Sequence, residues 1–424
     1  MSVTTTHKNR IVEADEDSSA PKQLINVERL PAEQAVSKLI EHAVDLGASD
    51  VFFCSFEQHT AIQVRHLGII RPIAIVTPEE GKRMVAHIRH SSGADVQDKR
   101  HPSDGRWIFR GETDAGVDLR INFLPTLHGD DVAIRLLIRG NELFSLDDLG
   151  MEESQLTSFK QMIETPAGLV LITGPTGSGK TATLYASLLH LHDGQHKINT
   201  IEDPVEYAVD GIHQSQINTA IDLGFAEVLR AIMRQNPDII MIGEVRDEET
   251  AKIAVRAANS GILVLATLHA PDAALAIQAM RAFGVPNHFL GTCLRGVVSQ
   301  RLVRTLDPES RIKFDLSDAP HTFDEVREYL EPTDGGALYA PGPRESNQFT
   351  GYSSRTGVFE VMTITRGIRN AIIEGKSADA VREQLRADKM LQFRQAALLK
   401  VARGVTSTEE LFRVIPTEQL LVDV

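Results

Sequence analysis

Apolar and polar positions recur with different periods along the chain, and these periods indicate where helices and strands form. In PAEQAVSKLIEHAVDLGASD, Val36, Leu39, Ile40 and Ala43 fall on one helical face, and Gly47 offers a place for the helix to end. Four runs downstream have the composition of strands: AIQVRHL, GRWIFRG, DLRINFLP and DVAIRLLI. The pattern of apolar positions from about residue 30 to residue 138 therefore predicts one helix and several short strands.

The middle of the chain predicts a parallel sheet. Four strongly apolar runs, LVLIT, INTIE, DIIMIG and LVLAT, are separated by helical or looped segments. Strands of this kind that alternate with helices are typical of a parallel sheet covered on both faces. After about Arg304 the regularity is lost, because two long segments rich in Pro, Gly, Ser and acidic residues follow. A helical tail is expected from Thr365 onward.

The composition of the chain restricts the classes of molecule to which it could bind. The chain has 424 residues, with 44 Lys and Arg against 58 Asp and Glu, which gives a formal net charge of −14. This charge argues against a protein whose main task is to bind nucleic acid or an anionic membrane surface. Cys54 and Cys293 lie among apolar neighbours and are expected to be core residues in a reducing cytoplasm. The N-terminus does not resemble a signal peptide, and each apolar run is far shorter than the roughly 20 residues of a membrane helix.

A phosphate-binding loop follows the first of the four apolar runs. The sequence GPTGSGKT fits the full pattern, with a strand expected before it and a helix after it. Glycines let backbone N–H groups surround the phosphates, Lys180 reaches the terminal phosphates, and the Thr181 hydroxyl binds Mg²⁺. The predicted nucleotide-binding positions are Gly174, Pro175, Thr176, Gly177, Ser178, Gly179, Lys180, Thr181 and Ala182.

The other three apolar runs bring reactive side chains to the same edge of the predicted sheet. Glu202 ends INTIE, Glu244 follows DIIMIG, and His269 follows LVLAT. The carboxyl ends of parallel strands meet at one edge, where ligands bind. A phosphate loop, two acids and a histidine at that edge suit phosphoryl transfer, which needs a group that orients water and groups that contact the terminal phosphate.

Each of these residues also has a simpler interpretation. Asp203 and Glu206 could begin a helix as its N-cap and capping box. Glu244 could be a solvated acid at a strand end, and His269 could be a hydrogen-bonded core histidine. The sequence alone leaves these alternatives open.

Longer segments around these residues match a known family. GLVLITGPTGSGKTATLYASL, TIEDPVEY, IMRQNPDIIMIGEVRDEETAKIAVRAANSG and LVLATLHAPDA match its phosphate loop, Asp box, Walker B segment and His box. SQRLVRTL, TGVFEVM and GVTSTEELFRV match downstream, and LGASD, HPSDGRW and VDLRINFLPTLHGDDVAIRLL match upstream. With these segments the chain, from about Leu46 to its end, resembles the type II secretion and type IV pilus ATPases of the GspE and PilB type.

The resemblance implies a hexameric cytoplasmic motor with ATP and Mg²⁺ as ligands. Such a motor docks on an inner-membrane platform protein, so its membrane association is peripheral, and it moves pilin-like subunits out of the membrane. The resemblance also implies that Glu244 activates water, and that Arg120 and Arg135 of the N-terminal sheet close over the terminal phosphate. Nucleic acid is not an expected partner.

The resemblance also sets the expected α/β architecture. The polar and acidic N-terminus itself predicts a disordered tail (1–28). After it, the resemblance implies an N-terminal, PAS-like α/β domain (29–145) and a RecA-like P-loop ATPase core with a parallel sheet (146–305). An irregular insertion and a helical region follow (306–424).

Three features depart from the family pattern. The zinc-binding cysteine pairs that follow QRLVR in assembly-type members are missing, so no zinc is expected there. The family's histidine and acidic positions after ASD are replaced. The chain begins near the family's second N-terminal domain, so recruitment without the extra leading domain is expected.

Two other classes of function fit parts of the sequence. A nucleotide-regulated scaffold would keep the phosphate loop, but intact Lys180, Thr181, Glu202, Glu244 and His269 argue against it. A RecA-like nucleic-acid translocase would share the fold, but the net charge and the absence of a basic stripe with aromatic residues argue against it. The exported substrate, and assembly as opposed to retraction, are left open.

Overall fold

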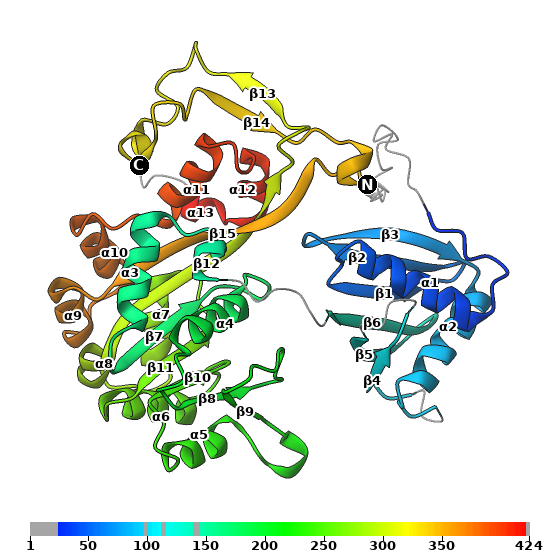
Figure 1. Cartoon of the computed structure of the whole chain (residues 1–424), viewed down its shortest axis with the longest axis horizontal. Helices are drawn as coiled ribbons and strands as arrows, with labels where there is room; N and C mark the ends of the chain where they lie inside the picture. The colour runs from blue at the N-terminus through cyan, green and yellow to red at the C-terminus, as the bar shows by residue number, and fades with distance from the viewer. Residues whose placement is uncertain (1–23, 97–99, 112–115, 139–144, 421–424) are drawn as a thin grey trace, which may run out of the picture. The chain divides into compact units, whose positions relative to one another are not determined.

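The computed structural model describes residues 24–96, 100–111, 116–138 and 145–420 (Figure 1). The chain forms two compact units, residues 1–138 and residues 139–424. Each unit has its own hydrophobic core. Most of the predicted tail 1–28 lies outside the described residues.

The first unit is an antiparallel sheet with two helices packed on one face. The strand order is β3-β2-β1-β6-β5-β4. Leu39, Ile40 and Ile88 of the helices pack with inward-facing strand residues such as Phe53 and Leu119. The elements are α1 (Ala32–Asp45), β1 (Asp50–Ser55), β2 (Thr60–His66), β3 (Ile69–Val76), α2 (Pro78–Ser91), β4 (Ser103–Phe109), β5 (Val117–Thr126) and β6 (Gly129–Ile138).

The predicted helix and the four predicted strands are present in this unit as α1, β2, β4, β5 and β6. The structure adds β1, β3 and α2. Pro72 obscures β3 in the sequence, and it is tolerated because β3 is an edge strand of the sheet. Helix α2 begins with a capping box in which Thr77 and Glu80 bond reciprocally, with Pro78 at the first helical position. The PAS-like character of this unit stays a prediction.

The second unit is built on a seven-stranded sheet in the order β15-β12-β7-β11-β10-β8-β9. Strands from β12 to β9 are parallel, and β15 pairs antiparallel with β12. The strands are β7 (Gly168–Thr173), β8 (Ile198–Glu202), β9 (His213–Gln216), β10 (Ile239–Ile242), β11 (Leu263–Leu268), β12 (Leu294–Leu306) and β15 (Tyr352–Thr363).

Helices cover both faces of this sheet, as the sequence predicts. Leu169 and Leu171 of β7 pack with α5 to α8, whereas the alternate residues Val170 and Ile172 pack with α3 and α4. The parallel-sheet prediction is confirmed. The helices are α3 (Glu153–Ile163), α4 (Lys180–Leu191), α5 (Phe225–Met233), α6 (Glu248–Asn259), α7 (Ala273–Ala282) and α8 (Asn287–Cys293), with short 3₁₀ turns η1 (Leu146–Leu149) and η2 (Thr219–Ile221).

The region expected to be irregular is more ordered than predicted. Strand β15 pairs with β12 along most of its length. Ser353, Ser354 and Arg355 in its first half are exposed, so the sequence has no apolar pattern there that would predict a strand. A helix begins after Thr365, as expected. The remaining elements are β13 (Ile312–Asp315), η3 (Asp324–Tyr329), β14 (Ala337–Ala340), η4 (Glu345–Asn347), α9 (Arg366–Ile373), α10 (Ala378–Ala387), α11 (Phe393–Ala402), α12 (Thr408–Val414) and α13 (Thr417–Leu420).

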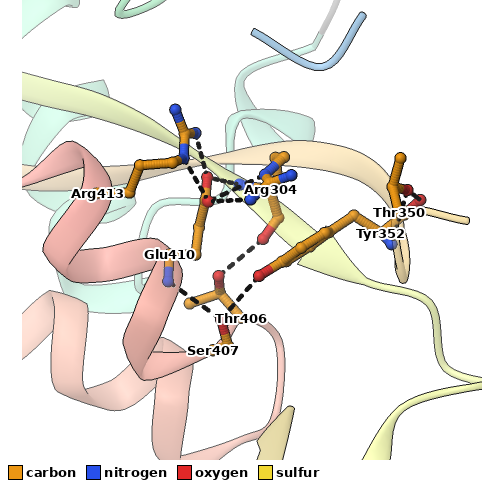
Figure 2. A network of polar contacts seen from close by, with 7 residues as sticks. All are labelled: Arg304, Thr350, Tyr352, Thr406, Ser407, Glu410 and Arg413. Carbon is orange, nitrogen blue, oxygen red and sulfur yellow. Dashed lines mark hydrogen bonds and ion pairs between the residues drawn. The ribbon is translucent and has the colours of Figure 1, made fainter. Parts of the chain in front are cut away.

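A buried polar network fixes the C-terminal helices to β12 and β15 (Figure 2). The carboxylate of Glu410 on α12 is fully buried and accepts from Arg304 Nε at 2.9 Å and Arg413 Nε at 2.7 Å. The guanidinium of Arg304 lies 3.8 Å from the ring centre of Tyr352, whose hydroxyl bonds Ser407 Oγ at 2.8 Å. Charge, hydrogen bonds and an aromatic face therefore join segments that are distant in sequence.

Candidate nucleotide-binding site

The phosphate loop lies between the buried strand β7 and the first turn of α4. Gly174, Gly177 and Gly179 have positive φ values of 148°, 77° and 88°. A Cβ at Gly174 would lie 2.5 Å from the carbonyl oxygen of Gln300, so this position requires glycine. The hydroxyl of Ser178 is buried and has no hydrogen-bond partner among the described residues. A loop of this shape, with an unsatisfied hydroxyl, fits the binding of phosphate oxygens.

Lys180 and Thr181 occupy the first turn of α4. Lys180 Nζ donates to the carbonyl oxygens of Gly174 at 2.9 Å and Pro175 at 3.1 Å. Burial lowers the pKa of Lys180, and Glu244 opposes this shift. The side chain of Thr181 is exposed. Both residues therefore lie beside the phosphate loop, and their contact with a nucleotide stays a prediction.

The side chain of Gln300 on β12 forms hydrogen bonds with the phosphate loop and with the helix that follows it. Its Nε2 donates to the carbonyl oxygen of Ser178 at 2.8 Å, and its Oε1 accepts from Thr183 Oγ1 at 2.9 Å. The side chain is 1% exposed. Gln300 thus contacts Ser178, which lies 122 positions earlier in the chain. Sequence reasoning did not find this residue, because the only signal was its place in the SQRLVRTL match.

Glu244, His269 and Arg246 form an ionic cluster beyond the ends of β10 and β11. His269 Nε2 lies 2.9 Å from Glu244 Oε1, and Arg246 Nε donates to Glu244 Oε2 at 2.7 Å. Arg246 also donates to Asp203 Oδ2 at 3.1 Å. Glu244 is therefore paired and only 19% exposed in its side chain, which distinguishes it from a solvated acid at a strand end.

Backbone contacts hold the strand ends in place around this cluster. Thr173 Oγ1 donates to the carbonyl oxygen of Ala270 at 2.9 Å and accepts from the Ala270 N–H at 2.8 Å. The N–H of Val245 donates to the Thr267 carbonyl oxygen at 2.8 Å. Thr267 Oγ1 donates to the carbonyl of Gly243. The loop, Glu244 and His269 consequently lie at one sheet edge, as the sequence predicts.

Glu202 has surroundings different from those of Glu244. It is 3% exposed, and its carboxylate accepts from Tyr185 Oη at 2.5 Å, Thr200 Oγ1 at 2.5 Å and Gln214 Nε2 at 3.1 Å. Burial, followed by the bond to Glu202, raises the pKa of Tyr185. Three donors saturate much of this carboxylate, so a positioning role fits it better than proton transfer.

The segment after Glu202 does not begin a helix. Residues 203–212 form bends and turns that lead to β9. Asp203 instead pairs with Arg246. The alternative that Asp203 and Glu206 form a helix cap is therefore wrong.

Arg120 and Arg135 lie side by side in the sheet of the first unit. They are directly opposite each other on β5 and β6, in a row that continues to Arg106 on one side and Asp50 on the other. Arg135 pairs with Asp50 at 3.6 Å, whereas Arg120 Nε is buried without a hydrogen-bond partner among the described residues. This row lies on the face opposite to the helices, because neighbouring Leu119 and Ile121 belong to the core. Their approach to the phosphate loop stays a prediction.

Comparison with known proteins decides the family. A profile described as Type II/IV secretion system protein matches residues 26–413. The chain belongs to this family. Curated relatives of this secretion-family chain include type II secretion system protein E of Dickeya dadantii, 39% identical over 388 residues that cover 92% of this chain and 76% of the relative.

Two further relatives extend the range of the family. Type II secretion system protein HxcR of Pseudomonas aeruginosa is 39% identical, in an alignment that covers 91% of this chain and 77% of HxcR. Type IV pilus assembly ATPase PilB of Thermus thermophilus is 37% identical, over 94% of this chain and 44% of its own length. The predicted family and the predicted P-loop ATPase activity of this secretion-family chain are confirmed.

Solved structures share the fold. The ATPase DotB of Legionella pneumophila superposes with a TM-score of 0.67 at 21% identity, over 92% of this chain and 96% of that one. The pilus retraction motor PilT with bound ADP has a TM-score of 0.59 at 24% identity, over 89% and 96%. The predicted α/β ATPase fold of the secretion-family chain is thereby confirmed.

The described part of the chain contains neither a membrane-spanning helix nor a cluster of metal-ligating side chains. No helix there combines the length and apolar character of a membrane span. No group of three or more His, Cys, Asp or Glu side chains in that part gathers in a way that could hold a metal ion.

Proposed function

We propose that this ATPase is a hexameric motor that extrudes pilin-like subunits in a type II secretion or type IV pilus system. It would work at the cytoplasmic face of the inner membrane, docked on a platform protein, without a zinc site. Family membership supports the ATPase activity and the secretion or pilus setting. One observation carries the proposal: Glu244 is held between His269 and Arg246 at the sheet edge that also carries the phosphate loop.

The phosphate loop would bind the ATP phosphates. Lys180 would exchange the carbonyls of Gly174 and Pro175 for phosphate oxygens, which are stronger acceptors because they are charged. Thr181 would hold Mg²⁺ with its exposed hydroxyl, and Ser178 would donate its unsatisfied hydroxyl. Mg²⁺, when bound, supplies charge neutralisation at the terminal phosphates.

Glu244 would orient the attacking water. The water oxygen bonds to the terminal phosphorus, the bond to the ADP oxygen breaks, and the water proton passes to the carboxylate. His269 and Arg246 fix the direction of that carboxylate through one oxygen each. Glu202 would keep Tyr185 and β9 in place beside the site.

Arg120 and Arg135 would reach the terminal phosphate when the first unit closes over the nucleotide. Their adjacent positions on one exposed face support this role. An arginine delivered by motion stabilises the transition state and makes hydrolysis depend on that motion. Chemistry and mechanical work would then be coupled.

ATP turnover per subunit, measured against protein concentration, tests the proposal. For Glu244→Gln we expect unchanged ATP affinity and turnover lower by about 10²–10⁴-fold, because the amide cannot accept the proton. For Lys180→Ala we expect loss of ATP binding, since the loop loses its cation. Wild-type turnover should rise with concentration if subunits complete each other's sites.

Three outcomes would contradict the proposal. Normal turnover in Glu244→Gln would move the water-orienting role to another acid, with Glu202 the first to test. A wild type that binds ATP but does not turn over at any concentration would favour a nucleotide-regulated scaffold. Stimulation by DNA that salt abolishes would favour a nucleic-acid translocase.

A further inference from the structure

A cavity separate from the phosphate loop lies between α5 and the strands β8 and β9. Its volume is about 420 Å³, within the range of small-molecule sites. Val228, Ala231 and Ile232 of α5 form an apolar wall, and Asn199 and Ser215 of the strands form a polar wall. Helix α5 lies beside β8 in Figure 1.

The cavity and the Glu202 cluster occupy opposite faces of the sheet. Side chains alternate along β8, so Asn199 faces α5 whereas Thr200 and Glu202 face α4 and Tyr185. The same alternation places Ser215 of β9 in the cavity and Gln214 on the Glu202 side. A ligand in this cavity would therefore be distinct from the nucleotide.

Asn199 is an unsatisfied polar group in the cavity wall. The residue is 6% exposed, and its Oδ1 is buried without a hydrogen-bond partner among the described residues. An acceptor left unpaired in a protein interior costs roughly 1–3 kcal/mol. Such a group in a cavity wall indicates a ligand with a hydrogen-bond donor.

A cation lies at the polar side of the cavity. The Lys197 ammonium has three donors, and the carbonyl of Gln235 accepts from it. His213, also in the lining, is exposed on the edge strand β9. A negative charge on the ligand would complement this side, while a flat apolar body would cover the α5 wall.

We propose that this cavity binds a small organic anion that has an apolar, planar body and one hydrogen-bond donor. The donor pairs with Asn199, and the anionic group pairs with Lys197. The second part of the proposal concerns regulation of ATP turnover, and it rests on the proposed function. The ligand holds His213 and Ser215 of β9, and Gln214 between them carries the effect to Glu202 beside the ATP site.

The first test uses 8-anilinonaphthalene-1-sulfonate, which has an anionic group, an apolar body and one N–H donor. The full chain is titrated with this probe in the presence of saturating ADP and Mg²⁺, and probe fluorescence is measured. We expect saturable binding that ADP does not displace. Displacement by ADP would overturn the proposal, because the probe would then occupy the nucleotide site.

Variants locate the probe. Ala231 is exposed on α5, so Ala231→Phe fills the cavity without crowding the core, and we expect it to weaken probe binding by at least about tenfold. Ala387→Phe on α10 is the matched control at another exposed helix position, and it should leave affinity unchanged. Asn199→Ala and Lys197→Met should each weaken binding. Equal affinity in wild type and Ala231→Phe would overturn the site.

Turnover separates the site from its regulatory role. Saturating probe should change wild-type ATP turnover at least about twofold and leave Ala231→Phe unaffected. Unchanged turnover in a wild type that binds the probe would overturn the coupling through Gln214 and leave the site standing. A wild type without ATP hydrolysis would overturn the proposed function, whereas the fluorescence titration would still decide the site.

Discussion

Glu360 on β15 is a carboxyl group in surroundings that favour its neutral form. Burial, followed by the nearby Asp272, raises its pKa to about 7. The backbone N–H of Ala273 donates to it at 3.2 Å, and the positive charges of Arg382 and Arg301 act in the opposite direction. The folded protein therefore holds this proton at pH values where the unfolded chain, with a pKa near 4.5, has lost it.

This difference makes stability depend on pH. Between pH 4.5 and 7 the folded state binds more protons at Glu360 than the unfolded state does, so this group lowers the unfolding free energy as pH rises. Relative to wild type, Glu360→Gln should gain roughly 2–3 kcal/mol in unfolding free energy between pH 5 and pH 8. Urea unfolding at the two pH values measures this. Glu383→Gln, at an exposed position of α10, is the control, and an equal response in both variants would contradict the assignment.

At the scale of elements, β12 connects the phosphate loop with the C-terminal helices. Gln300 holds the loop, and Arg304, four residues later, holds Glu410 of α12. Local sequence pattern predicts the loop, because its glycines and Lys180 are contiguous. It cannot predict Gln300 or the partner of Arg304, because their bonds join residues 122 and 106 positions apart.

The network in Figure 2 should make the C-terminal helices sensitive to the loss of a single charged partner, because Glu410 is fully buried. Arg304→Met leaves the fully buried Glu410 with a single cationic partner, so we expect a loss of about 3–5 kcal/mol in unfolding free energy. Arg413→Met removes a more exposed partner, and a loss of about 1 kcal/mol is expected. Urea unfolding followed by circular dichroism compares them. Equal losses would show that Arg304 and Arg413 contribute alike.

At the scale of the whole molecule, the residues proposed to act on ATP come from two compact units. Sequence reasoning placed Glu244, His269 and Lys180 correctly at one edge, because strand ends in a parallel sheet follow from the order of elements. It could not say where Arg120 acts, because the working position of one unit against another depends on contacts between folded surfaces.

Arg120 provides a test at this scale. Arg120→Ala should lower ATP turnover by roughly a thousandfold, because the transition-state charge loses its partner, while ATP affinity stays the same. Arg83→Ala, at an exposed arginine of α2 in the same unit, is the matched control and should turn over normally. Turnover and nucleotide affinity are measured side by side. An unchanged rate in Arg120→Ala would make it a structural residue of the sheet.

The spacing of Gln300 and Arg304 on β12 also restricts how this chain can vary in length. Adding or deleting a single residue between them would reverse the alternation of side chains and turn one of the two to the other face of the sheet. Either the phosphate loop or the Glu410 network would then lose its partner. Tolerated gains and losses of residues are thus expected beyond Leu306, in the connection that returns to β15.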